Sequence, residues 1–215
     1  MIPISYSLKR LAQKASETKY LVKDGRGFRL QNQAPSSGEH HACTLIDFPT
    51  LRQAYQYSCG ANCVQTLMQY YGYDVRENAI MNKLKVTKDG TEVSNIIKYL
   101  KANGFNVESG IHTIDDLIKN IKKGTPVILP LQAYSDGDSY AKNYRSGHYV
   151  TAIGYTDKHI IFSDPSSVYD TYLTHEELDE RWHDTGINGK DFEHFAIIPK
   201  GKDPEYSSSK ILRMP

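Results

Sequence analysis

Hydrophobic and polar residues follow a regular pattern only after the first 46 residues of the chain. A short helical candidate covers Leu8 to Tyr20, but residues 25–42 after it are rich in Gly, Ser, Gln and His and show no apolar period. Such a composition is typical of irregular structure. We therefore interpret residues 1–46 as an N-terminal extension that is irregular apart from this helical candidate.

The first regular elements after the extension are helices. Apolar residues spaced three and four apart predict an amphipathic helix over residues 59–71. Thr91 and Thr113 are expected to cap the helices that follow them. This part of the sequence predicts further helices over residues 78–84, 91–103, 113–123 and 174–183, and the last of them begins with a capping-box pattern of Thr174 and Glu177.

Most of the expected strands come later in the chain. They cover residues 105–109, 125–134, 148–155, 159–165 and 193–200. Residues 156–158 turn the chain, so the strands on either side of them form an antiparallel hairpin. Because helices come first and strands cluster late, we expect an α+β domain over residues 47–199, with a mostly antiparallel sheet packed against the helices. A polar C-terminal tail, residues 200–215, follows.

The composition fits one globular domain plus an extension. Of the 215 residues 39% are hydrophobic, and the mean hydropathy is -0.55. With 26 Lys and Arg against 25 Asp and Glu, the net charge of +1 provides no field to attract nucleic acid or an anionic membrane. No apolar stretch reaches the roughly 18 residues of a membrane span, and the N-terminus lacks a signal-peptide core. We expect a cytoplasmic protein.

The three cysteines, Cys43, Cys59 and Cys63, are an odd number in a chain too large to depend on disulfides, so we interpret them as thiols. Cys59 stands at the first turn of the predicted helix, where unpaired backbone N–H groups and the positive end of the helix dipole favour a thiolate. Gly60 would let a substrate carbonyl approach the sulfur. Taken alone, a cysteine at a helix start is more often a small buried residue.

The hairpin downstream makes a reactive cysteine more plausible. His148 stands where its first strand begins and Asp164 where its second strand ends, so the fold of the hairpin brings the two roughly opposite each other. A sulfur at a helix N-terminus, an imidazole to share its proton and a carboxylate to hold the imidazole are the parts of a cysteine nucleophile system. Each residue alone would more often be structural.

Several local sequences resemble those of papain-like cysteine peptidases. They are QAYQYSCG with Gln53 six positions before Cys59, the helix ending YYG, then GHYVTAIGY, FSDPS, TYLTHEELDERWHD and EHFAIIP, which together cover roughly Ile46 to Pro199. The match is closest to the bacteriocin-processing double-glycine leader peptidase family and its stand-alone bacterial relatives. The resemblance implies a papain-like fold in which the cysteine helix packs on an antiparallel sheet.

The resemblance also implies residue roles. Cys59 would be the nucleophile, His148 the general base and later general acid, and Asp164 the residue that orients His148. Gln53 would donate its side-chain amide to the oxyanion, beside the backbone N–H of Cys59. Gln56 is nearer to Cys59 in the sequence and is an alternative for this role. Only the spacing that is typical of the family favours Gln53. The implied reaction is hydrolysis of a peptide or protein through a thioester, without a cofactor.

Other residues near the site have open interpretations. Tyr57 and Gly147 are candidates for substrate binding. The loop over residues 135–147 is either a substrate-contacting lid or a plain connector, and its DGDS stretch resembles a calcium loop only faintly because no Glu follows at the required position. Cys63 shares the helical face of Cys59 and should pack in the core. A structural zinc site is the alternative, with ligands drawn from His40, His41, Cys43, Cys59 and Cys63. Trp182 is expected to be a core anchor.

Three functions remain open on the sequence. The leading one is a cysteine endopeptidase, and the same thioester would also serve a transferase or an amidase. The third is a catalytically silent module that binds peptides, against which the intact Cys59, His148 and Asp164 argue. Leader peptidases usually precede membrane spans and an ATP-binding domain, which this sequence lacks, so the double-glycine rule does not transfer directly. A transporter or secretion system is a candidate partner, and the extension is a candidate pro-segment, docking arm or tail.

Overall fold

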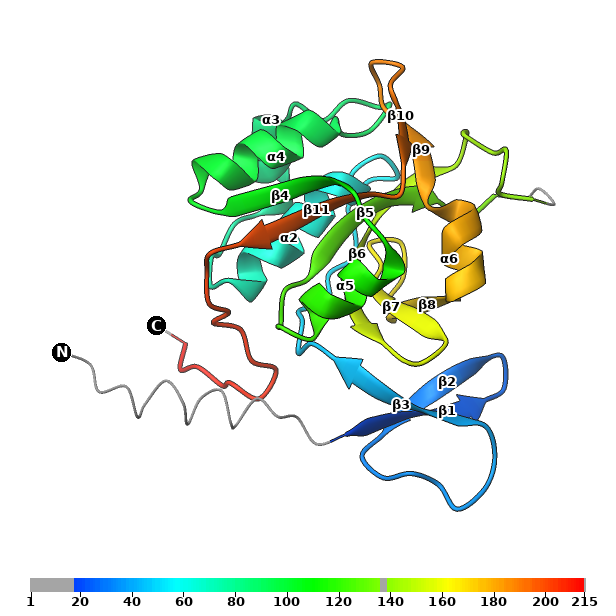
Figure 1. Cartoon of the computed structure of the whole chain (residues 1–215). Coiled ribbons are helices and arrows are strands. Elements are labelled where there is room, and N and C mark those ends of the chain that lie inside the picture. Colours follow the sequence, from blue (N-terminus) through cyan, green and yellow to red (C-terminus); the bar gives the residue numbers. More distant parts are fainter. Residues whose placement is uncertain (1–17, 136–138, 215) are drawn as a thin grey trace.

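A computed structural model describes residues 18–135 and 139–214 (Figure 1). The strands are β1 (Lys19–Asp24), β2 (Gly27–Gln31), β3 (His40–Leu45), β4 (Asn106–Ile111), β5 (Val127–Gln132), β6 (Gly147–Tyr155), β7 (His159–Ser163), β8 (Thr171–Thr174), β9 (His183–Thr185), β10 (Asp191–Glu193) and β11 (Phe195–Lys200). The helices are α2 (Cys59–Tyr70), α3 (Glu77–Leu84), α4 (Val93–Ala102), α5 (Ile114–Ile121) and α6 (His175–Arg181).

One nine-stranded sheet organises the molecule. Seven strands follow the order β2-β1-β3-β6-β5-β11-β4, and β7 and β8 continue the sheet from β6. All of these pairings are antiparallel. Strands β9 and β10 form a separate two-stranded ribbon. The predicted α+β class with a mostly antiparallel sheet is confirmed.

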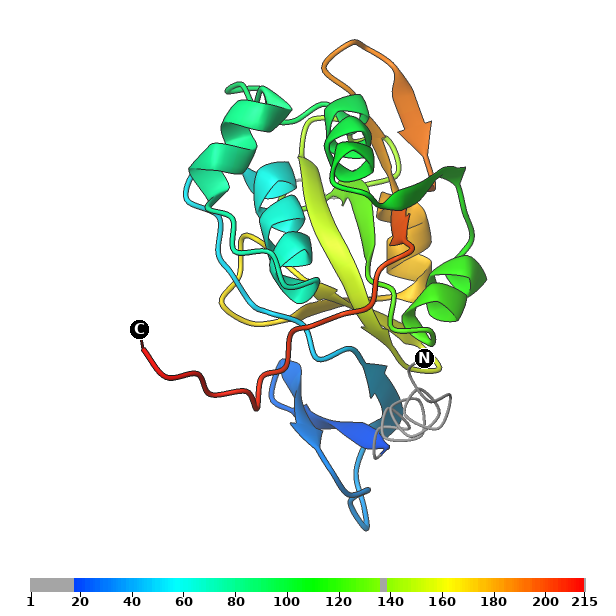
Figure 2. The same cartoon turned by 90° about the vertical axis from the view of Figure 1, so that its left-hand side faces the viewer.

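Helices lie on both faces of the sheet. Helix α2 packs against β6 and is covered by α3 and α4, whereas α5 lies on the opposite face against β5 and β6 (Figures 1 and 2). The side chains of Ala61, Val64 and Leu67 on α2 are fully buried. Burial of these apolar side chains, rather than helix propensity, is what stabilises α2 in the centre of the domain. The first residue of this helix is therefore held rigidly.

Two of the predicted helix caps are present, and one is wrong. Thr113 and Thr174 each form a complete capping box at the start of α5 and α6. The N-cap of α4 is Glu92 rather than Thr91, and it makes no side-chain cap hydrogen bond. Thr91 is buried with its side chain packed towards Gly60 of α2, so it does not turn back to cap α4.

Trp182 is a core anchor, as the sequence predicts. Its side chain is fully buried, stacks on the His194 ring at a centroid distance of 5.1 Å and donates from Nε1 to the carbonyl oxygen of Phe195 over 2.9 Å. A buried indole N–H needs such a partner, because an unpaired donor in the core costs free energy. The contact fixes the end of α6 to the start of β11.

The prediction that the extension is irregular is wrong for the part that the structure describes. Strands β1, β2 and β3 lie within it, and β3 pairs with β6 where Leu45 opposes Gly154, so they continue the main sheet. These strands have five or six residues and few buried positions, such as Leu21 and Cys43, so their alternation is too short for a sequence pattern to reveal. Residues 8–17 of the helical candidate lie outside the described residues, and its end belongs to β1.

Aromatic contacts join these strands to the rest of the sheet. The rings of Phe28 and His41 pack edge-on against His159, and Phe28 also contacts Tyr172, at centroid distances of 5.0 to 5.3 Å. Nδ1 of His41 lies 2.8 Å from a carboxylate oxygen of Asp157. The domain boundary at residue 46 stays a prediction, although the sheet passes across it.

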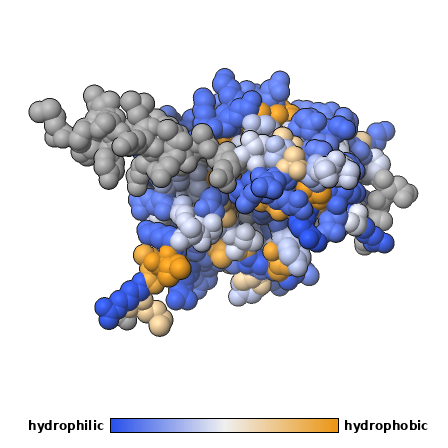
Figure 3. Space-filling model, turned by 90° about the horizontal axis from the view of Figure 1, so that it is seen from below, coloured by the Kyte–Doolittle hydropathy of each residue, from blue (hydrophilic) through white to orange (hydrophobic). Residues whose placement is uncertain are grey.

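The C-terminal tail passes the end of α2. The backbone N–H groups of Glu205 and Tyr206 both donate to the carbonyl oxygen of Tyr70. The face shown in Figure 3 is mostly hydrophilic, with hydrophobic residues in small separate patches. In the tail itself, Ile211 and Leu212 are exposed. Within residues 18–135 and 139–214, no helix has the length and apolar character needed to cross a membrane.

Candidate active site

Cys59 is the first residue of α2, and this residue is only 7% exposed. The loop before it is fixed by Ser58, whose hydroxyl donates to the Tyr55 carbonyl over 2.9 Å and accepts from the Tyr55 backbone N–H. The first turn of α2 contains no acidic residue. The positive end of the helix dipole therefore acts on the sulfur without a competing carboxylate, an arrangement that favours the thiolate.

His148 and Asp164 meet as the hairpin predicts. His148 is the second residue of β6, and Asp164 directly follows β7. Thr151 opposes Ser163 in the register, so the two side chains are offset by two positions along the strands. Nε2 of His148 nevertheless lies 2.9 Å from Oδ1 of Asp164, and both side chains are buried. The remaining ring nitrogen, Nδ1, is left for the Cys59 thiol, which is hydrogen-bonded to this imidazole.

The charges of this group stabilise one another. Burial disfavours a charged imidazole, but the hydrogen bonds to Asp164 and Cys59 outweigh burial and raise the pKa of His148 to about 9. Burial likewise disfavours the Asp164 carboxylate, but the hydrogen bond and the charge of His148, together with hydrogen bonds from Tyr134 and the Ser166 backbone, outweigh burial and lower the pKa of this carboxyl group. At neutral pH the geometry thus supports a protonated His148 between the Cys59 sulfur and the Asp164 carboxylate.

Tyr134, which sequence reasoning missed, completes the surroundings of Asp164. Its hydroxyl donates to Oδ2 of Asp164 over 2.5 Å, and its ring packs edge-on against His148 at 5.5 Å. Thr171 donates to the same oxygen over 3.2 Å. Tyr134 has a backbone φ of 58°, a conformation that costs free energy in a residue other than glycine and is often found at functional sites. Nothing in the local sequence signals this position.

Gln53 lies beside the loop that follows Asp164. Its backbone N–H donates to the Pro165 carbonyl over 2.9 Å, and its Oε1 accepts from the Ser166 hydroxyl over 3.3 Å. Nε2 donates to the Tyr55 carbonyl over 2.7 Å, which leaves a second N–H of this amide for another acceptor. The competing Gln56 is exposed. The role of Gln53 at the oxyanion stays a proposal.

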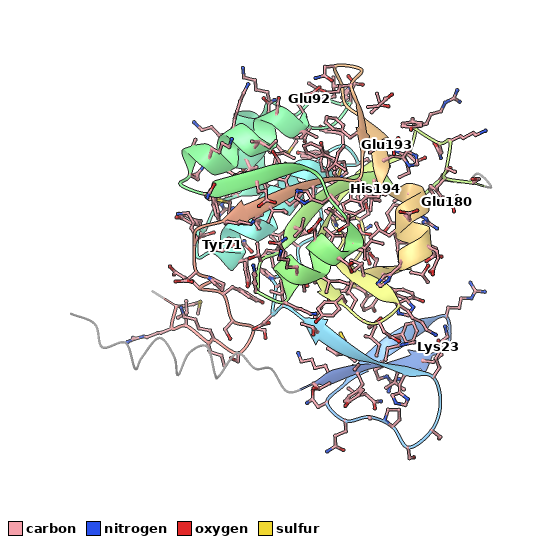
Figure 4. The ribbon with its side chains drawn as sticks, viewed as in Figure 1. Lys23, Tyr71, Glu92, Glu180, Glu193 and His194 are labelled. Atoms are coloured by element: carbon pink, nitrogen blue, oxygen red, sulfur yellow. The ribbon has the colours of Figure 1, made fainter. Side chains whose placement is uncertain are left out.

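A cleft opens next to Cys59. Its volume is about 240 Å³, and its walls come from the segment before α4, the end of the loop before β6 and the β9–β10 ribbon. Gly147 lines this cleft, but Tyr57 does not; Tyr57 instead stacks on Tyr55 at 5.5 Å. The ribbon is tied across to α4, because the backbone N–H of Asn188 donates to Oε1 of Glu92 over 2.9 Å (Figure 4).

The loop before His148 is held from two sides. Glu180 of α6 accepts from the backbone N–H groups of Tyr140 and Ala141, and Glu193 of β10 accepts from the Tyr144 hydroxyl (Figure 4). Tyr144 also lines the cleft, so this loop borders the space in front of Cys59. Of the DGDS stretch that faintly resembles a calcium loop, residues 136–138 lie outside the described residues.

Gly60 has a packing role that the sequence does not predict. A Cβ atom at this position would lie 2.9 Å from Cβ of Thr91 and 3.1 Å from the Tyr149 ring. Contacts this short cannot be accommodated without movement of the neighbours. Gly60 therefore allows close packing of α2 against Thr91 and β6, and its part in substrate access stays a prediction.

The other two cysteines are separate from the nucleophile position. Cys63 is 1% exposed and packs in the core as predicted, and burial raises the pKa of its thiol. Cys43 lies in β3, and burial raises the pKa of its thiol to about 11. For the parts of the chain that the structure describes, no three His, Cys, Asp or Glu side chains are placed to hold a metal ion.

Comparisons with known proteins give a family and a fold. Residues 47–191 match the Peptidase C39 family. The fold is similar to that of a double glycine motif protease from an AMS/PCAT transporter in complex with its leader peptide, with 19% identity, a TM-score of 0.53, and coverage of 73% of this chain and 94% of that chain. The peptidase domain of Streptococcus ComA, a bifunctional ABC transporter, is 20% identical with a TM-score of 0.53, covering 73% and 99%.

A third similar structure is a putative C39-like peptidase from Bacillus anthracis. It is 16% identical, has a TM-score of 0.55, and the match covers 74% of this chain and 98% of that chain. At this level of identity the solved structures establish the fold. The search of curated proteins gave no match.

Proposed function

Because this chain belongs to the peptidase C39 family and is therefore a cysteine peptidase, we propose that it is an endopeptidase that cleaves peptides or proteins through a thioester on Cys59. One observation carries the proposal: the Cys59 thiol at the start of α2 is hydrogen-bonded to His148, whose Nε2 lies 2.9 Å from Asp164. These groups fit the roles of nucleophile, general acid and base, and orienting carboxylate.

The first half of the reaction transfers the acyl group to sulfur. The Cys59 thiolate adds to the substrate carbonyl carbon, and a tetrahedral oxyanion forms. The backbone N–H of Cys59 at the helix start and the second Nε2 hydrogen of Gln53 stabilise this oxyanion. The C–N bond then breaks while His148 gives its proton to the leaving nitrogen, which leaves a thioester and a neutral imidazole.

The second half returns the enzyme to its starting state. Neutral His148 accepts a proton from water, whose oxygen attacks the thioester carbon. The C–S bond breaks, and a carboxylic acid leaves as the thiolate and the imidazolium form again. Asp164 keeps Nε2 of His148 occupied throughout, so Nδ1 stays directed to the sulfur and the substrate. Tyr134 acts as a positioning residue, because it holds Asp164 and covers the edge of the imidazole.

Membership of the family does not identify the substrate. One similar structure contains a leader peptide, and two belong to transporters. We therefore include in the proposal that the substrate is a peptide and that a transporter or secretion system is a partner. The cytoplasmic location stays a prediction. The same thioester would accept an amine instead of water in a transferase, or would form from another amide and be hydrolysed in an amidase, so a transferase or amidase is the second candidate.

A digest of a proteome-derived peptide library tests the proposal. The wild type and the control variant Cys43→Ala should cut a shared set of peptides, and Cys59→Ala should cut none of them, because only Cys59 carries the acyl group. Mass analysis in the presence of an added amine separates hydrolysis from acyl transfer. Cleavage of the same peptides by Cys59→Ala, or no cleavage by the folded wild type, would contradict the proposed function.

A further inference from the structure

A carboxylate shares the cleft with Cys59. Asp184, in β9, lines the same cavity as Cys59 and Gly147. A Cβ atom added at Gly147 would lie 2.7 Å from Oδ1 and 2.9 Å from Oδ2 of Asp184. The carboxylate therefore lies directly against the residue that precedes His148, close to where a scissile bond must be placed. None of the proposed catalytic steps uses it.

The carboxylate is fixed in place from the side of the core. The fully buried Gln132 donates from Nε2 to Oδ1 of Asp184 over 2.9 Å and to the His183 carbonyl over 3.2 Å. Oε1 of the same amide accepts from the backbone N–H of Ser146 over 2.9 Å. Gln132 thus joins β9 to the segment before His148. A side chain held this firmly is suited to recognition, because little conformational entropy is lost when a ligand binds.

The positive charge of His148 acts on this carboxylate only from a distance. Among residues 18–135 and 139–214, Asp184 forms no ion pair with a Lys, Arg or His side chain. Burial disfavours its charged form more than its hydrogen bonds favour it, so its pKa is raised to about 6. At neutral pH it is therefore mostly ionised, and it is mostly buried. A cation in the cleft would supply the missing partner.

The rest of the lining suits the stem of a long cationic side chain. Phe192, Ile187 and Tyr149 contribute apolar surface to the cleft. Lys and Arg side chains place their methylene groups on such surfaces and their charged ends on a polar group. The other two charged residues of the lining, Asp89 and Arg145, are exposed, so water and salt screen them more than they screen Asp184.

We propose that Asp184 forms a substrate subsite that binds a Lys or Arg side chain close to the scissile bond. This inference rests on the proposed function, since the subsite serves a peptide that Cys59 attacks. It names a substrate class that the family match does not specify: peptides with a basic residue beside the cleavage site.

The experiment uses N-acetylated, quenched fluorescent peptides built on a sequence that the wild type cuts. Lys, norleucine or Glu is placed at each of the three positions on either side of the cut, so the only cation is a side chain. At one position, the wild-type kcat/KM for the Lys peptide should be about tenfold to a hundredfold above that for the norleucine peptide. The Glu peptide should have the lowest kcat/KM of the three. Asp184→Asn should reduce the Lys-to-norleucine ratio to about twofold or less. The matched control, Asp89→Asn, should keep the ratio.

The outcomes separate the subsite from the peptidase function. If the wild type cuts all three peptides at similar rates, or if Asp184→Asn keeps the Lys preference, the subsite is wrong while the peptidase function stands. If cleavage does not depend on Cys59, the proposed function fails and the subsite fails with it. If Asp184→Asn does not fold, the wild type alone still tests the subsite. Only a carboxylate subsite predicts that kcat/KM falls in the order Lys, norleucine, Glu.

Discussion

Nε2 of His148 lies 2.9 Å from Oδ1 of Asp164, although 16 residues separate them in the chain. The hairpin of β6 and β7 brings them together, and burial of both side chains strengthens the interaction by keeping water away. On its other side, His148 is hydrogen-bonded to Cys59. The two hydrogen bonds oppose the effect of burial and keep the imidazole protonated around neutral pH.

This charge state sets the upper pH limit of activity. The pKa of His148 is raised to about 9, so the proton needed by the leaving amine is present below that pH and lost above it. We expect kcat/KM to fall as the pH rises through about 9. In Asp164→Asn the upper limit should move to lower pH, because the carboxylate no longer stabilises the imidazolium. A wild-type profile that stays flat to about pH 10.5, or an unchanged limit in Asp164→Asn, would contradict this assignment.

Tyr134→Phe removes the hydrogen bond to Asp164 and keeps most of the ring packing against His148. A hydrogen bond to a charged group contributes about 1.5 to 3 kcal/mol, so kcat should fall about tenfold with little change in KM. The bond also helps to lower the pKa of Asp164, so its loss should shift the acid limit of activity to higher pH. The control is Tyr155→Phe, whose hydroxyl instead accepts from Thr44. An unchanged acid limit would exclude a positioning role for Tyr134.

Gly60→Ala tests the packing of α2 beneath the site. The new Cβ would lie 2.9 Å from Cβ of Thr91, and overpacking of this kind costs about 1 to 3 kcal/mol of unfolding free energy. Gly27→Ala is the control, because no atom lies within 4 Å of a Cβ at that position. Gly27→Ala should change the free energy of unfolding by no more than about 0.5 kcal/mol. Urea denaturation measures both, and equal stabilities for the two variants would contradict the packing argument.

Variants of Glu92 test whether the hydrogen bond between the two walls of the cleft shapes the substrate site. Glu92 accepts from the backbone N–H of Asn188, and both segments border the substrate space. Glu92→Ala should free the β9–β10 ribbon and raise KM about threefold to tenfold with kcat within about twofold. Glu92→Gln keeps an acceptor oxygen and should remain close to the wild type. If steady-state kinetics give both variants the same KM, the hydrogen bond does not shape the cleft.

The sequence predicts the parts of the site that depend on local pattern. Helical periodicity places Cys59 at a helix start, and strand alternation around a turn brings His148 to Asp164. These inferences succeed because each depends on neighbours within one element or one hairpin. The α+β class follows in the same way from the order of helices and strands.

The sequence cannot predict contacts that cross the fold. Tyr134 reaches Asp164 over 30 positions, and Gln132 reaches Asp184 over 52, so no periodic pattern connects them. Thr91 has the residue type of a helix cap, yet its tertiary packing against Gly60 overrides that preference. The early strands β1 to β3 are missed because their few buried positions leave too little alternation.

The most direct test of the central claim is the rate at which iodoacetamide alkylates each cysteine in the native protein at about pH 6. At this pH an ordinary thiol is almost entirely protonated, whereas a thiolate paired with protonated His148 still reacts. Mass spectrometry should find Cys59 alkylated at least about tenfold faster than Cys43 and Cys63, and this excess should disappear in His148→Gln. Alkylation of Cys59 no faster than that of Cys43, or a rate that His148→Gln leaves unchanged, would contradict the claim that Cys59 is an activated nucleophile.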